Sequence, residues 1–354
     1  MNGEFIEALD QIEKEKGISK DILIDAIEAA LISGYKRNYG SAQNVKVYIN
    51  RDSGEVKVFS LKDVVENAES DLLEISLEEA KEIDSNYELG DVVEKEVTPR
   101  NFGRIAAQTA KQVVVQRIRE AERGIIYDQF INRESEIVTG IVQRISKGNV
   151  FINLGKTEAI LAPGEQIPDE EYKHNDRIKT YIIEVKKTTK GPQILVSRTH
   201  PGLVKRLFEL EVPEIHDGVV EIRSISREAG SRTKIAVYSK DPNVDPVGAC
   251  VGHKGTRVQA IVDELKGEKI DIIKWSESPE EFIASALSPS KVVRVEVKED
   301  EKSALVVVPD YQLSLAIGKE GQNARLAAKL TSWKIDIKSE TQYKESITHA
   351  KTDE

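Results

Sequence analysis

The sequence predicts a multidomain α+β protein with a mixed α/β N-terminal domain, a five-stranded β-barrel and two copies of one α/β unit. Three patterns in the 354 residues predict this fold class. Helical periodicity dominates the first third of the chain, short alternating strands fill the middle, and one order of helices and strands occurs twice in the last part. The length leaves room for several domains, each with its own core.

The N-terminal domain, residues 1–125, is predicted to begin with two helices and a hairpin. Phe5, Leu9 and Ile12 recur at spacings of four and three, which places them on one apolar face of a first helix. A second helix follows, and alternating valines and isoleucines on both sides of the turn at 52–54 then predict a β-hairpin.

A further helix is predicted from Phe102 to about Arg123. Ala106, Ala110, Val114 and Ile118 recur there at spacings of four, which gives the helix one narrow apolar stripe. We expect this helix to connect the N-terminal domain to the next one as a stiff element.

The acidic charge of the chain is concentrated in its first hundred residues. The net charge is −10 overall, but residues 1–100 hold 12 Lys and Arg against 23 Asp and Glu, a net of −11. The remainder holds 39 basic and 38 acidic residues, a net of +1. An acidic domain binds phosphate poorly, so we interpret residues 1–125 as a protein-docking module with Phe5, Leu9 and Ile12 as its contact face. A merely solvated acidic surface is the alternative.

The middle segment, residues 134–199, is predicted to form a small barrel of the OB type. Five short runs of alternating apolar residues are separated by Gly, Pro and Asn, and they lie at 137–142, 150–154, 158–161, 178–185 and 193–197. Such barrels bind single strands with exposed aromatic rings and a positive groove. Phe151 is the candidate platform, with Arg144 and Lys147 beside it. The alternation leaves open whether Phe151 faces solvent or the barrel core.

Two loops of one type carry most of the functional information. Gly252-His253-Lys254-Gly255 and Gly318-Lys319-Glu320-Gly321 each follow a short apolar run and open a predicted helix. A Gly-x-x-Gly turn lets a nucleic-acid backbone approach peptide groups without interference from Cβ atoms, and it points helix N-terminal N–H groups at phosphate. One such loop occurs often by chance. Two in matched surroundings predict the clamp by which KH domains hold single-stranded nucleic acid.

The surroundings of the two loops also repeat. The strand Lys-Ile-Asp-Ile begins at Lys269, 17 positions after Gly252, and at Lys334, 16 positions after Gly318. The predicted order is helix, two strands, helix, loop, helix and strand in both copies, which is the type II KH fold. We place the first unit at 200–276 and the second at 277–345, with a tail at 346–354.

The candidate RNA contacts follow from these loops. Lys254, Arg257 and Lys319 can reach phosphate, whereas Glu320 reduces the phosphate affinity of the second loop. The first loop is therefore the stronger predicted contact. The residues predicted to contact RNA in the two units are Gly252, His253, Lys254, Gly255, Arg257, Gly318, Lys319, Gly321, Gln322 and Arg325.

At this point the chain resembles a known family. The order of acidic domain, S1-type barrel and two KH units is similar to the bacterial NusA family of transcription elongation and termination factors. The local matches are Asp-Pro-Val-Gly-Ala-Cys-Val-Gly at 245–252, Ser-Pro-Glu-Glu-Phe-Ile at 278–283 and Ser-Arg-Thr-His-Pro at 197–201.

The resemblance implies a function. It implies that the N-terminal domain docks on RNA polymerase near the RNA exit channel, and that the barrel and KH units bind emerging RNA. The protein would then modulate pausing, termination and antitermination. We expect RNA polymerase, single-stranded RNA and other transcription elongation factors as partners of a monomeric chain.

Composition excludes several other classes. One cysteine cannot form a disulfide framework, and five histidines show no metal-ligand spacing, so no metal or cofactor is expected. The sequence has neither a membrane-length apolar run nor a signal peptide, which predicts a cytoplasmic protein without membrane contact. A phosphorolytic ribonuclease also carries KH and S1 modules, but they follow large catalytic domains, and no catalytic motif appears here, so no enzymatic activity is expected. A ribosome assembly protein is a second alternative. Such a protein would be expected to be basic overall, whereas this chain has a net charge of −10.

Overall fold

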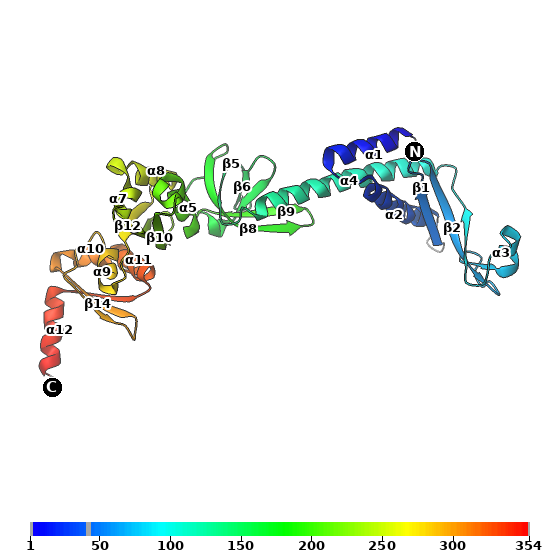
Figure 1. Ribbon diagram of the computed structural model, residues 1–354. Coiled ribbons are helices and arrows are strands. Elements are labelled where there is room, and N and C mark those ends of the chain that lie inside the picture. Colours follow the sequence, from blue (N-terminus) through cyan, green and yellow to red (C-terminus); the bar gives the residue numbers. More distant parts are fainter. Residues whose placement is uncertain (1–2, 40–43, 353–354) are drawn as a thin grey trace. The chain divides into compact units, whose positions relative to one another are not determined.

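The computed structural model describes residues 3–39 and 44–352 (Figure 1). The chain divides into two compact units, the first ending at Ile125 and the second beginning at Ile126. The first unit contains the predicted N-terminal domain, and the second contains the barrel and both KH units. The finer domain boundaries given above stay predictions.

The first unit combines helices with a four-stranded sheet. Strand β2 is central, with β1 and β4 antiparallel to it and β3 parallel. Val47 pairs with Val58 and Ile49 with Val56, which confirms the predicted hairpin. The elements are α1 (Gly3–Lys16), α2 (Lys20–Tyr39), β1 (Asn44–Ile49), β2 (Val56–Val65), β3 (Glu74–Ser76), α3 (Leu77–Ile83), β4 (Val92–Glu96) and the larger part of α4 (Phe102–Ile131), whose last residues belong to the second unit.

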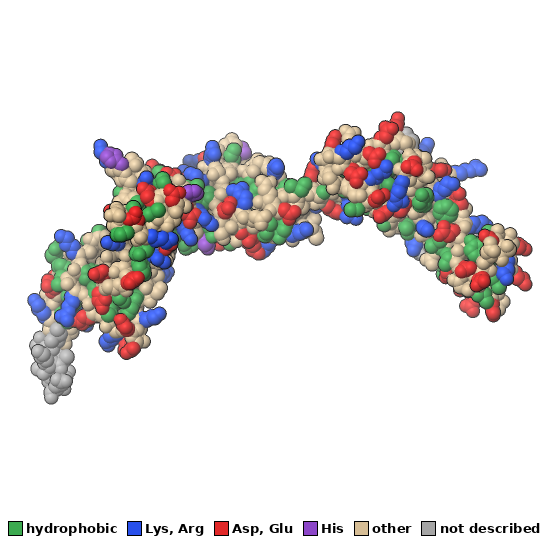
Figure 2. All heavy atoms as spheres, in the orientation of Figure 1, with side chains coloured by type: hydrophobic (Ala, Val, Ile, Leu, Met, Phe, Trp, Pro, Cys, Tyr) green, Lys and Arg blue, Asp and Glu red, His purple; other side chains and the backbone are tan. Residues whose placement is uncertain are grey.

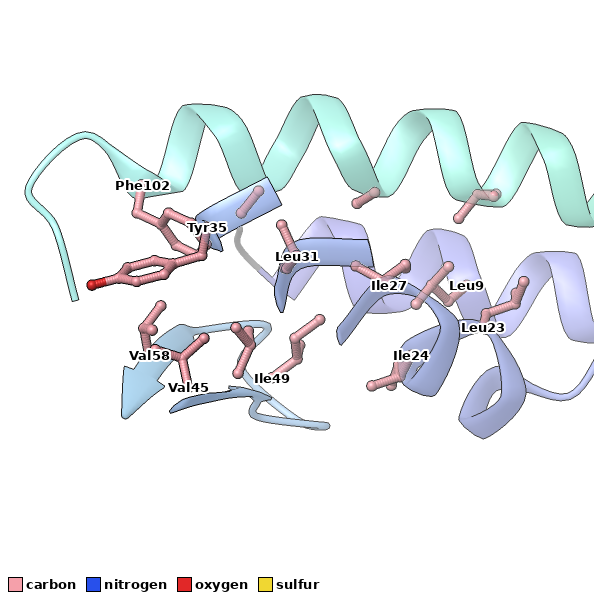
Figure 3. Packing of buried hydrophobic residues seen from close by; sticks show 14 residues of the cluster. Leu9, Leu23, Ile24, Ile27, Leu31, Tyr35, Val45, Ile49, Val58 and Phe102 are labelled. Atoms are coloured by element: carbon pink, nitrogen blue, oxygen red, sulfur yellow. The ribbon is translucent and has the colours of Figure 1, made fainter. Parts of the chain in front are cut away.

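The core of this unit lies between helices α1, α2 and α4 and the β1–β2 hairpin. Figure 3 shows Leu23, Ile27 and Leu31 of α2 packed among side chains from the helices and the hairpin. Phe102 closes one end of the core, where its ring meets Tyr35 edge to face at 5.9 Å. Ala106, Ala110 and Val114 are buried, so the predicted apolar stripe of α4 is confirmed.

Helix α4 ends at Ile131, beyond the predicted end near Arg123. Its last turns carry apolar residues that pack against the barrel core, namely Ile126, Tyr127, Phe130 and Ile131. These tertiary contacts favour continued helix where the four-residue spacing of the first part has already ended.

The predicted five-stranded barrel is confirmed. Its strands close in the order β5-β6-β7-β9-β8 around a buried apolar core. Val150 and Ile152 of β6 face this core. The strands are β5 (Ile137–Ser146), β6 (Asn149–Asn153), β7 (Glu158–Leu161), β8 (Arg177–Thr188) and β9 (Gly191–Ser197).

The two KH units share one topology. In each, the first strand is antiparallel to the second and the second is parallel to the third, as the type II order requires. The first unit contains α5 (Pro201–Glu211), α6 (Pro213–His216), β10 (Val220–Glu228), β11 (Arg232–Ser239), α7 (Pro246–Val251), α8 (Thr256–Glu264) and β12 (Lys269–Lys274). The second contains α9 (Pro279–Ala286), β13 (Arg294–Lys298), β14 (Ser303–Val308), α10 (Leu313–Ile317), α11 (Gln322–Thr331) and β15 (Lys334–Ser339). Helix α12 (Glu340–Thr352) follows β15 and crosses the predicted start of the tail.

A buried arginine joins the barrel to the first KH unit. Arg198 is fully buried, and its guanidinium donates to both carboxylate oxygens of Glu170 at 2.5 and 3.0 Å. It also donates to the backbone carbonyl of Lys179 at 2.9 Å and to that of Glu264, the last residue of α8, at 3.0 Å. Burial alone would lower the pKa of Arg198, but the hydrogen bonds and charge of Glu170 hold it above its ordinary value. This ion pair therefore fixes α8 against the barrel.

The two KH units pack against each other. Ala236 and Ile273 from the first sheet are buried in the same core as α9 and α11 of the second unit. Lys234 is also buried there, and its Nζ donates to Asp271 at 2.9 Å and to the carbonyl of Ser288 at 2.7 Å. Burial lowers the pKa of this lysine. This contact holds the two KH units in one orientation relative to each other.

Candidate nucleic-acid interface

The two Gly-x-x-Gly loops have nearly the same backbone conformation. Gly252 has φ/ψ of 74°/177° and Gly318 has 78°/171°. The third loop residues, Lys254 and Glu320, both adopt left-handed conformations near 51°/27° and 53°/26°. The second glycines also match, with 79°/12° and 75°/13°. Two segments of different sequence thus fold into one loop geometry.

Glycine is required at the first position of each loop. A positive φ combined with an extended ψ is accessible only to glycine. Space is also lacking, because a Cβ on Gly318 would lie 2.8 Å from the backbone nitrogen of Asn323, and one on Gly252 would lie 2.7 Å from Cγ of Arg257. Conformation and space therefore both require glycine at the first position of each loop.

Each loop opens a helix without a side-chain cap. Gly255 precedes α8 and Gly321 precedes α11, and neither provides a side chain to accept from the first N–H groups. The first N–H of each helix donates to a loop carbonyl, from Thr256 to His253 and from Gln322 to Lys319. The next N–H groups have no side-chain cap, and together with the helix dipole they favour an anion at this end. His253, Lys254 and Lys319 are exposed beside them. Figure 2 shows basic and histidine side chains projecting near α7 and α8.

Arg257 is held within the first KH unit. Its Nη1 donates to Glu214 at 2.9 Å and to the carbonyl of Ala249, near the end of α7, at 2.6 Å. Its side-chain carbons also lie against Gly252. The predicted phosphate contact thus already has partners, and its position supports the shape of the first loop.

Gln322 and Arg325 join the second KH unit to the first. Gln322 donates to Glu228 at 2.9 Å and to the hydroxyl of Ser231 at 2.8 Å, while Arg325 donates to Glu228 at 2.6 Å and to the carbonyl of Glu320 at 3.0 Å. The hydrogen bond from Arg325 holds the pKa of Glu228 below its ordinary value. These two side chains fix the second loop relative to the first unit, a contact that the sequence analysis did not foresee.

Phe151 lies on the outer face of the barrel. It alternates with the buried Val150 and Ile152, which resolves the open alternative in favour of the surface. The guanidinium of Arg144 lies 3.6 Å from the centroid of its ring, and Arg144 also pairs with Glu158 at 3.0 Å. Lys147 is exposed in the turn between β5 and β6. The three residues predicted here are therefore all on the barrel surface, and one ring face of Phe151 is already covered by Arg144.

A second cation–aromatic cluster was missed. The guanidinium of Arg223 lies 4.9 Å from the ring centroid of Tyr238 and 5.3 Å from that of Trp275 in the first KH unit. The three residues are far apart in the sequence and meet only through the pairing of β10, β11 and the end of β12. Only the strand alternation around each of them could have hinted at this cluster.

The predicted contact face of the N-terminal unit is partly core. Leu9 is buried at 1 % exposure, whereas Phe5 and Ile12 are half-buried against the same cluster. All three line an apolar groove between α1 and α4, which Val115 and Lys111 of α4 complete. Figure 2 shows acidic side chains on the visible face of this unit, around α1 and around α3.

The described residues bear on metal binding, thiol reactivity and membrane crossing. No three His, Cys, Asp or Glu side chains in residues 3–39 and 44–352 come together in a group that could hold a metal ion. Burial raises the pKa of the Cys250 thiol to about 12, which makes this thiol a poor nucleophile. Within the described part of the chain, no helix is long and apolar enough to cross a membrane.

Comparisons with known proteins agree along the whole chain. Residues 4–124 match the NusA N-terminal domain, 132–197 the S1 RNA binding domain, 198–275 the NusA-like first KH domain and 279–345 the NusA-like second KH domain. The transcription termination/antitermination protein NusA of Halalkalibacterium halodurans is 68 % identical over 345 residues, covering 98 % of this chain and 90 % of the relative. The NusA of Bacillus subtilis is 66 % identical, covering 98 % and 93 %. A solution structure of the N-terminal domain of B. subtilis NusA has 63 % identity and a TM-score of 0.33, covering 35 % of this chain and 99 % of the other.

Proposed function

The chain belongs to the NusA family of transcription termination/antitermination proteins, and we propose that it binds single-stranded RNA through its paired KH loops while its N-terminal unit docks on RNA polymerase. It is an RNA-binding transcription factor that acts on termination and antitermination. The finer assignment, of particular residues to RNA and to polymerase, is the proposal.

One observation carries the RNA-binding part of the proposal. Two Gly-x-x-Gly loops of different sequence hold the same backbone dihedral angles, and both open uncapped helices. A geometry that glycine alone permits, found twice, indicates a common ligand rather than two independent helix caps. The packing of Ala236 and Ile273 into the second KH core holds the two loops in one body, so a single RNA strand can contact both.

Charge and apolar surface together support polymerase docking. The first hundred residues carry a net charge of −11, which disfavours RNA, whereas the groove of Phe5, Ile12 and Val115 offers an apolar contact. Apolar surface rimmed by polar residues is typical of protein interaction sites. Other elongation factors remain expected partners of the same complex.

The groove gives a matched pair of variants on one helix. Val115 lines it with 39 % of its surface exposed, whereas Ile125, 59 % exposed, is not among the groove residues. We expect Val115→Asp to weaken binding to bacterial RNA polymerase at least tenfold, because a carboxylate buried in an apolar contact costs at least about 1.4 kcal/mol.

The measurement is a titration of labelled full-length chain with polymerase, with Ile125→Asp as the control. Both variants should bind a short RNA as well as the wild type does. If the Val115 and Ile125 variants bound polymerase equally well, the groove would not be the docking site.

A further inference from the structure

An exposed apolar strip adjoins the second KH loop. It consists of Tyr311, with 81 % of its surface exposed, Leu315 with 47 % and Ile317 with 38 %. An isolated exposed leucine needs no explanation, but three large apolar side chains within seven positions of the chain, next to a candidate RNA loop, indicate a binding surface.

The strip has a fixed backbone. Tyr311 lies in a short 3₁₀ turn, Asp310–Gln312, that runs directly into α10 and then into Gly318. The carboxylate of Asp310 accepts from the backbone N–H and the hydroxyl of Thr341 at 3.3 and 3.1 Å. On the other side, the amide oxygen of Gln312 accepts from the N–H of Lys291 at 2.5 Å. The segment that carries the ring is thus anchored on both sides.

The order of the elements places Tyr311 near the loop. Tyr311 lies in the 3₁₀ turn before α10, Leu315 lies within α10, and Lys319 lies in the loop after it, so one short helix, Leu313–Ile317, separates the turn from the loop. The ring of Tyr311 is eight positions along the protein chain from Lys319. An RNA strand with a phosphate at Lys319 therefore has an aromatic ring nearby on the protein.

The first KH unit has a different chemistry at the matching positions. When Gly252 is aligned with Gly318, Tyr311 corresponds to Asp245, and Leu315 to Ala249. Asp245 is an N-cap, since its carboxylate accepts from the N–H groups of Val247 and Gly248. The two middle residues of the first loop are His253 and Lys254. Those of the second loop are Lys319 and Glu320, whose charges cancel. The first KH unit therefore offers charge to a ligand, and the second KH unit offers apolar surface.

We propose that Tyr311, supported by Leu315, is a stacking platform for a nucleobase of single-stranded RNA, so that the second KH unit binds mainly by stacking and the first mainly by phosphate contacts. Stacking on an aromatic side chain accepts any base and depends little on salt, because no counterion is released. This inference rests on the proposed RNA binding, and its test separates the two.

The test uses the full-length chain and an unstructured RNA of about 12 nucleotides, selected from a random pool by binding to the wild-type chain. Tyr311→Ala should weaken binding about 5- to 150-fold, the range expected for one lost base stack, with the slope of log K against log salt unchanged. Tyr311→Phe keeps the ring and should bind within about twofold of the wild type. Tyr48→Ala, which removes a tyrosine that is 43 % exposed on β1 of the N-terminal unit, is the control and should have no effect.

An abasic scan identifies the contact directly. Removing one base at a time should reveal a position whose loss weakens the wild type but not the Tyr311→Ala variant, since the two changes delete the same contact. If the wild-type chain bound RNA and the Tyr311→Ala variant bound it equally well, the stacking platform would be wrong. The proposed RNA binding would still stand. A wild-type chain that binds no RNA would overturn the proposed function itself.

Discussion

Replacing His253 and Lys254 together by aspartate is expected to weaken the binding of single-stranded RNA roughly tenfold to hundredfold. These exposed side chains flank the uncapped start of α8, where an anion is favoured. A charge-assisted hydrogen bond contributes about 1.5–3 kcal/mol, and a carboxylate at the same place repels phosphate. The slope of log K against log salt should also become shallower, by about 0.7 for each phosphate contact that is lost.

The control makes the same chemical change elsewhere in the first KH unit. His216 and Lys205 are exposed on α6 and α5, and their replacement by aspartate alters the net charge equally. We expect this control to bind RNA nearly as well as the wild type in an anisotropy titration at several salt concentrations. Equal losses in both double variants would mean that overall charge, rather than the loop, determines affinity.

Replacing Arg198 by methionine is expected to lower the free energy of unfolding of the compact unit that contains the barrel and both KH units, by about 3–5 kcal/mol. The side chain is fully buried, and its removal leaves the carboxylate of Glu170, 2 % exposed, without its cation. The hydroxyl of Tyr172 still donates to Glu170 at 2.7 Å, but one neutral donor does not replace a bidentate guanidinium. The carbonyls of Lys179 and Glu264 also lose a donor.

Tryptophan fluorescence during denaturant unfolding measures this effect. The chain has two tryptophans, Trp275 and Trp333, and both lie in the KH part of the second unit. Lys186→Met is the matched control, because it breaks a surface pair with Glu184 whose side chains are 50 % and 47 % exposed. We expect the control to change the free energy of unfolding by less than about 1 kcal/mol. A similar small change for Arg198→Met would contradict the structural role given to this ion pair.

Repetition explains why the KH units could be predicted from the sequence. Each unit lacks a decisive motif by itself, but the spacing of Gly252 to Lys269 and of Gly318 to Lys334 shows that one fold occurs twice. Strand order and loop conformation depend on this local pattern, and the structure confirms both.

Long-range partners explain what the sequence could not predict. Arg257 and Arg325 have the residue type and position of phosphate contacts, but Glu214 and Glu228 pair with them from 43 and 97 positions away. Nothing local to either arginine indicates such a partner. The outward face of Phe151 was equally undetermined, because alternation fixes which residues share a face but not which face is buried.

A single-round transcription assay tests the central claim most directly. Purified bacterial RNA polymerase transcribes a template with a hairpin terminator, alone or with the full-length chain, and the fraction of terminated RNA is measured. We predict that the wild-type chain changes this fraction, that the His253→Asp, Lys254→Asp double variant has a much smaller effect, and that the His216→Asp, Lys205→Asp control acts like the wild type. A wild-type chain without effect, or a loop variant as active as the wild type, would contradict the claim that this protein acts on transcription through RNA held at its KH loops.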